Sequence, residues 1–186
     1  MRRWQTGHHA FFVLIQGIVI NQRQLLARLR QGNISASRAA FKRATRLLDA
    51  SAAAMRLTGR MPASCYDAVR ESMTPPSVPA GFSGLWSIDH RAMIDELKAL
   101  KRQIVVLDDD LIEDHQSWMA ALDRAYQSHA YVCEQFVGDG PSLAMRTEKN
   151  TSQRSGLQSL DAFRERTLNL AAMRGSKQKA TPSCEE

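Results

Sequence analysis

An apolar face recurs through one long segment of the chain, at the three- and four-residue spacing of an α-helix. Its members are Trp118, Leu122, Ala125, His129, Val132 and Phe136. A β-strand would alternate with a period of two, so this spacing predicts a helix from about Asp108 to Val137. Aromatic residues make up only 6% of the chain, which also disfavours an all-β fold. We therefore expect an all-α protein.

Glycine, serine and proline punctuate the rest of the chain and predict five further helices. Their expected ranges are 9–30, 35–57, 64–73, 87–102 and 159–173. Ser35 or Ser37 can cap the second helix, and Gly59 can end it. Residues 104–107 could form a strand, but one strand has no partner here, so we assign them to a helix or its approach.

The length of 186 residues corresponds to about one domain. We expect a single helical domain over residues 1–174, including a loop over 74–81 because its three prolines cannot sit inside a helix. Residues 138–156 are expected to form a long polar loop. The polar segment 175–186 is expected to be a disordered tail.

The net charge of +6 raises the question of nucleic-acid binding. Part of the excess lies on one predicted helix, at Arg38, Lys42, Arg43 and Arg46. No aromatic residue interleaves these charges, and no zinc-finger or helix-turn-helix spacing is present. We interpret them as a solvated surface and expect no specific nucleic-acid partner.

The N-terminal segment resembles a signal peptide because Arg2 and Arg3 precede an apolar stretch over 10–20. Gln16 and Gly17 interrupt that stretch, no small-residue cleavage site follows it, and it is too short to span a membrane. We expect a buried helix, no membrane association and, with only three scattered cysteines, a cytoplasmic protein.

His129 is the first candidate for chemistry because it interrupts the apolar face with an imidazole. Cys133 follows one helical turn later, so both side chains can reach one bound group. Two ligands make only half of a zinc site, whereas one histidine on an apolar helix face suits proximal heme ligation. The alternative is an ordinary core histidine.

Two other sets of histidines are candidates for a cofactor or metal site. His8 and His9 open the expected first helix beside Phe11 and Phe12, where they could line the opposite side of a flat apolar cofactor or be incidental. His90, Glu113 and His115 suggest a di-iron site, but the paired Glu-x-x-His motifs of such bundles are absent.

Four segments, in order, give the chain a family resemblance. They are 11–16 with 23–26, 71–75 with 81–86, 129–138, and 150–160. In these segments the chain resembles the tryptophan 2,3-dioxygenase family and its wider group of histidine-ligated, heme-dependent aromatic oxygenases. The resemblance implies a helical bundle with a heme b pocket between helices, in a homo-oligomer.

The same resemblance implies roles for individual residues. His129 corresponds to the axial heme ligand, Thr151 to a loop threonine that meets the substrate, and Phe11 and Phe12 to the distal side. Thr6 falls where the family has its distal histidine, which leaves His8 and His9 as the catalytic candidates. Asp89 falls at the family's carboxylate-binding arginine, and Arg91 follows two residues later as the candidate substrate ligand.

We expect a heme-dependent oxygenase that uses dioxygen or peroxide on a tryptophan- or indole-like substrate. The alternative is hydroxylation of a tyrosine-like substrate, because His129-x-x-x-Cys133 resembles a motif whose cysteine is joined to a heme vinyl group in members of the same group. A heme-binding protein without turnover and a cofactor-free interaction bundle also stay open.

Overall fold

The computed structural model describes residues 2–72, 75–77 and 87–136. Its helices are α1 (Arg2–Arg30), α2 (Ile34–Gly59), α3 (Ala63–Ser72), α4 (Ile88–Ile104) and α5 (Ile112–Phe136), with a 3-10 turn, η2 (Asp109–Leu111), before α5. No strand occurs in these ranges, so the expected all-α fold is confirmed there. The expected sixth helix, the loop over 138–156 and the tail over 175–186 lie outside the described residues.

Helix α1 is longer than the sequence pattern predicts, because it begins at Arg2 rather than near His9. Residues 2–8 contain no proline, and the Trp4 ring stacks on the His8 ring one turn later, with centroids 4.5 Å apart. These contacts favour a continuous helix over this segment. His8 and His9 therefore lie within α1, and the expectation that they open the helix is wrong.

The turn between α1 and α2 is built by a glycine and an asparagine. Gly32 has a φ of 64°, the left-handed conformation that commonly ends a helix. Asn33 caps α2, and its side-chain oxygen accepts a hydrogen bond from the backbone N–H of Ala36 at 3.0 Å. The expected caps, Ser35 and Ser37, lie inside α2, because the helix already starts at Ile34.

The caps of the later helices agree more closely with the sequence. Ser87 caps α4, and its hydroxyl accepts a hydrogen bond from the backbone N–H of His90 at 3.1 Å. Asp108 caps η2 through the backbone N–H of Asp110 at 2.9 Å. Residues 104–107 end α4 and turn toward α5, which confirms their assignment to a helix and its approach rather than to a strand.

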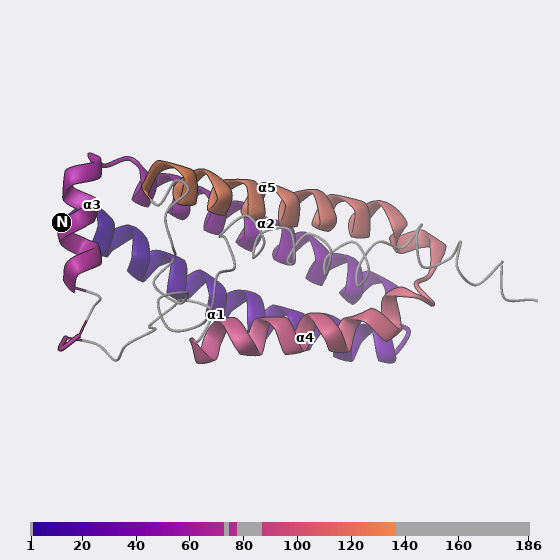
Figure 1. The fold of residues 1–186 in the computed structure, drawn as a ribbon. Helices are drawn as coiled ribbons and strands as arrows, with labels where there is room; N and C mark the ends of the chain where they lie inside the picture. The colour runs from indigo at the N-terminus through magenta and orange to yellow at the C-terminus, as the bar shows by residue number, and fades with distance from the viewer. Residues whose placement is uncertain (1, 73–74, 78–86, 137–186) are drawn as a thin grey trace, which may run out of the picture.

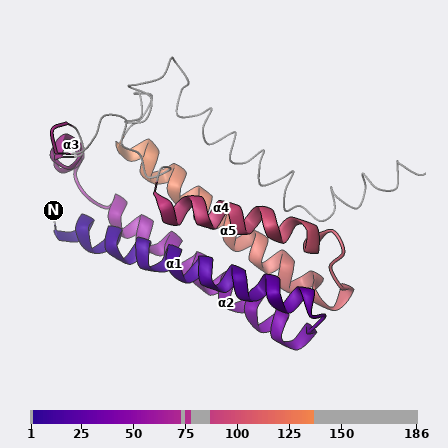
Figure 2. The same ribbon diagram turned by 90° about the horizontal axis from the view of Figure 1, so that it is seen from below.

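The four long helices form a bundle in which α1 packs on α2 and α4, and α2 also packs on α5 (Figure 1). The contacts Arg38–Asp114, Asp49–Arg124 and Arg56–Ser128 join α2 to α5 at a nearly constant sequence offset. A constant offset means that these two helices run parallel. Helices α1 and α4 also run in the same direction, and Arg23 of α1 pairs with Glu96 of α4 at 2.7 Å (Figure 2).

The core occupies the middle of this bundle. Its members from all four helices include Ile18, Leu25, Phe41, Leu97, Leu100, Ile104 and Trp118, each no more than 1% exposed. Among the described helices, only α1 is long and apolar enough to cross a membrane by length and composition. One face of α1 packs on α2 and α4, but only 39% of its apolar window is buried, so α1 is less buried than expected.

Candidate functional site

His129 lies where the buried stripe of α5 becomes accessible. Trp118, Leu122 and Ala125 are 0%, 4% and 8% exposed, and His129 follows them on the same stripe as an exposed residue. The surrounding protein nevertheless lowers the pKa of its imidazole by desolvation, and the charge of His90 lowers it further. His129 therefore lies in protein surroundings that stay open to solvent on one side, and these surroundings favour the neutral form of its ring.

His90 is the partner that the fold brings to His129. It lies in the first turn of α4, and its pKa is lowered by burial. The electrostatic effect of His90 on His129 shows that the fold brings the two imidazoles near enough for their charges to interact, although 39 residues separate them in the sequence. The sequence pattern suggests His90 only as part of a di-iron site and does not indicate this pairing.

A signal for His90 was present in the periodicity of α4. Its buried residues Met93, Leu97, Leu100 and Ile104 recur at spacings of three and four, and His90 continues that series by one step toward the N-terminus. His90 thus begins one core-facing stripe, and His129 lies near the end of another. Two imidazoles at the edge of the core can both bind one metal centre, because neutral imidazole is a metal ligand.

Contacts with the end of α2 show which part of α1 lies level with His129. Gly7 of α1 packs so closely on α2 that an added Cβ would overlap the Thr58 hydroxyl. At the next residue of α2, a Cβ on Gly59 would meet Val132 of α5 at 3.1 Å. The first turns of α1 and the last turns of α5 therefore lie at the same end of the bundle, which we call the N-terminal end (Figure 1).

A row of three aromatic rings runs along α1 at this end. The His8 ring stacks on Trp4 and meets the Phe12 ring edge-on, with His8 and Phe12 centroids 5.1 Å apart. Burial lowers the pKa of His8, and the charge of His9 lowers it further. His9 is exposed. Of the two catalytic candidates, only His8 is part of this aromatic row.

The structure connects the other predicted site residues less directly to His90 and His129. Phe11 is half-buried and packs against the core. Arg91 is exposed in the first turn of α4, next to His90 in sequence, and Asp89 is half-buried. Cys133 is a residue of α5, one turn after His129. Thr151 lies outside the described residues.

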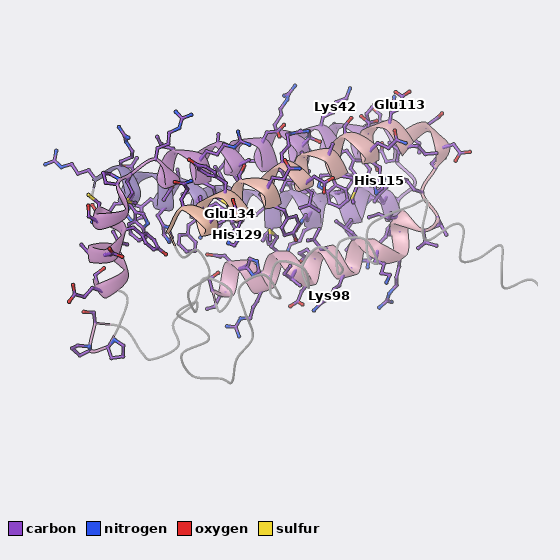
Figure 3. The ribbon with its side chains drawn as sticks, turned by 45° about the horizontal axis from the view of Figure 1, so that its top comes forward. Lys42, Lys98, Glu113, His115, His129 and Glu134 are labelled. Carbon is purple, nitrogen blue, oxygen red and sulfur yellow. The ribbon has the colours of Figure 1, made fainter. Side chains whose placement is uncertain are left out.

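His115 and Glu113 are separated from this site along α5. His115 is 2% exposed and packs against Phe41 and Trp118 in the core, whereas Glu113 is exposed. Figure 3 shows both toward the start of α5, with His129 and Glu134 near its end. Across the described ranges, no three His, Cys, Asp or Glu side chains gather around a metal ion. A heme iron differs, since a single protein histidine can hold it.

Two hollows in the described residues lie away from His129. One, of about 180 Å³, lies between α2 and α5 and includes Lys42 and Asp114. The other, of about 230 Å³, lies beside the α1–α2 turn and includes Gly32 and Leu111. Both are smaller than a usual small-molecule site of about 300–1,000 Å³. Neither one is the expected heme pocket.

Comparisons with known proteins now specify the family. The 3-methyl-L-tyrosine peroxygenase of Streptomyces lavendulae is 29% identical over 184 residues, which is 98% of this chain and 50% of that relative. The chain thus spans about half of the relative's length. No solved structure matches.

The relative is named for an aromatic amino acid, in agreement with the expected class of protein. It supports the tyrosine-like alternative better than the tryptophan-like expectation. A family model also matches residues 1–127, which include α1, α2, α4 and most of α5. Because that match covers more than half of the sequence, the chain belongs to the SfmD 3-methyl-L-tyrosine peroxygenase family.

Proposed function

We propose that this chain forms the heme-binding part of a peroxygenase that hydroxylates a tyrosine-like aromatic amino acid. The observation that carries the proposal is the proximity of His90 and His129 at the edge of the core, in a member of a peroxygenase family. The relative's name supports the tyrosine-like substrate and peroxide as the oxidant.

The residues at the N-terminal end of the bundle fit a heme group. His129 would hold the iron as the family resemblance implies, and His90 would hold it from the opposite helix. The lowered pKa of each ring favours the neutral form that binds a metal. Cys133 follows His129 by one helical turn in the sequence of α5, and a thioether between its sulfur and the heme is proposed on the family resemblance.

When bound, the heme would supply the transfer of one oxygen atom from peroxide to the aromatic ring, with release of water. The chain's own residues would bind and orient the substrate and exclude water. Arg91 lies in the same turn of α4 as His90, and its guanidinium suits the substrate carboxylate. Thr151 is proposed to contact the substrate on the family resemblance alone.

The absorption spectrum of the purified protein tests the heme site. We expect a Soret band, which His129→Ala removes or shifts and His90→Ala shifts. His9→Ala serves as the matched control, because His9 is an exposed histidine of the same end. Absence of heme from the well-folded wild-type protein would favour a cofactor-free interaction bundle.

Two further measurements separate the remaining alternatives. Acid–organic extraction should leave heme on the wild-type polypeptide and remove it from Cys133→Ala. Extraction of the heme from both proteins would make Cys133 a simple thiol.

Peroxide consumption with 3-methyl-L-tyrosine, tyrosine and tryptophan tests turnover. A heme band without turnover on any of them would favour a heme-binding protein without enzyme activity.

A further inference from the structure

The aromatic row of α1 lies on a helix face that another helix covers farther along. Ile15 and Val19 continue the row of Trp4, His8 and Phe12 at helical spacing, and both are buried, at 5% and 7% exposure. The same face then reaches Arg23, which pairs with Glu96 of α4. The row is therefore the N-terminal extension of the α4-facing side of α1.

Helix α4 begins too late to cover the row. The Arg23–Glu96 pair sets the register of α1 and α4, and α4 starts eight residues before Glu96, at Ile88. Because the two helices run parallel with the same rise per residue, Ile88 lies level with about Ile15. Trp4, His8 and Phe12 thus extend beyond the start of α4, and each is half-exposed.

The row also lies toward the end of the bundle that holds the candidate heme ligands. Gly7 contacts the last turn of α2, and the same turn contacts Tyr131 and Val132, which follow His129 by two and three residues. His90 lies at the start of α4, on the side of α1 to which the row belongs. The rings and both imidazoles therefore lie toward the same end of the bundle.

The chemistry of the row fits a neutral phenol ring. An indole face and a phenyl edge favour an aromatic ligand through stacked and edge-on contacts. The imidazole between them, when neutral, has one ring nitrogen that accepts a hydrogen bond from a hydroxyl. Helix α1 has no acidic residue, so this surface has no carboxylate to pair with an ammonium group.

We propose that Trp4, His8 and Phe12 form the binding surface for the phenol ring of the substrate, and that the His8 imidazole accepts the hydrogen bond from the phenol hydroxyl. The inference rests on the proposed function for the identity of the substrate. His8 would then hold the ring by its hydroxyl, while the stack with Trp4 fixes the orientation of the imidazole.

Binding of p-cresol and 4-methylanisole to the full chain as purified, measured by ligand-observed NMR, tests this proposal. The two probes share a ring, but only p-cresol can donate a hydrogen bond. We expect p-cresol to bind about three- to ten-fold more tightly, as for one net hydrogen bond. Equal affinities in the wild-type protein would overturn the proposal.

Variants locate the effect. His8→Phe keeps an aromatic ring but removes the acceptor, so we expect the preference for p-cresol to disappear, whereas His8→Gln, with an amide oxygen, should keep part of it. His9→Phe is the matched control and should keep the full preference. Trp4→Ala should weaken both probes similarly. A preference that survives in His8→Phe would contradict the assignment.

The outcomes also separate this inference from the proposed function. A p-cresol preference that depends on His8, in a protein without a heme band, would support the phenol surface and refute the heme proposal. A heme band with peroxide-dependent turnover, but equal binding of both probes, would refute the phenol surface alone.

Discussion

Replacement of Gly17 and of Gly59 by alanine should change the free energy of unfolding in opposite directions, because the two glycines differ in the space beside them. A Cβ on Gly17, inside α1, would lie 3.4 Å from the nearest atom of Leu47, which is an ordinary contact. Alanine exceeds glycine in helix propensity by about 0.5–1 kcal/mol in a helix interior. We expect Gly17→Ala to raise the free energy of unfolding by about that amount.

At Gly59 the added methyl group has less room. Its Cβ would lie 3.1 Å from the Val132 side chain and 3.3 Å from the Tyr131 ring, so these side chains of α5 must move by a few tenths of an ångström. Overpacking of a core costs about 1–3 kcal/mol, and this partly exposed contact belongs at the lower end. Gly59 is also the last residue of α2, where helix propensity contributes less. We expect a loss of about 1 kcal/mol.

Urea unfolding of the two variants measures the difference, which should be about 1.5–2 kcal/mol, or a gap of about 3–8 °C in melting temperature. Displacement of these side chains, which follow His129 by two and three residues, should also alter the surroundings of His129 in Gly59→Ala. If the proposed heme is bound, we therefore expect its spectrum to shift in that variant only. Gly59→Ala as stable as Gly17→Ala would refute the inferred closeness of α2 and α5 at this end.

Two further predictions concern the core and the histidines. Phe41 is 0% exposed and contacts both His115 and Trp118, so Phe41→Ala should lower the free energy of unfolding by about 3–5 kcal/mol. Val13 is 67% exposed, so Val13→Ala should change it by less than about 0.5 kcal/mol. Urea unfolding of both variants measures the difference. Equal effects would contradict the observed core. Folding lowers the pKa values of His90 and His129 below the ordinary value of about 6.5. The unfolded chain therefore binds protons at a higher pH than the folded protein does. We expect the free energy of unfolding to be highest above about pH 6.5 and to fall as the pH is lowered. The fall between about pH 7 and pH 5 should be smaller in a His90→Gln, His129→Gln double variant, and an equal fall would show that these two groups do not cause it.

Much of the local structure follows from the sequence, because helical periodicity and capping depend on residues within a few positions of one another. The stripe through Trp118 and Leu122 predicts α5 and its buried face, and Ser87 predicts the start of α4. Where two local signals competed, the prediction was wrong. Asn33 rather than a following serine caps α2, since Gly32 in the left-handed conformation places the asparagine at the helix start.

The sequence by itself also identified His129 as an unusual residue, an imidazole on an apolar helix face. Only the tertiary structure decided what lies opposite. His90 comes near it because α4 and α5 pack on different members of the α1–α2 pair, and their stripes converge at the core's edge. The close packing of Gly7 in α1 on the distant end of α2 is likewise set by the tertiary structure. Periodicity states which face of a helix is buried, but the partner of that face is set by packing between segments far apart in the chain.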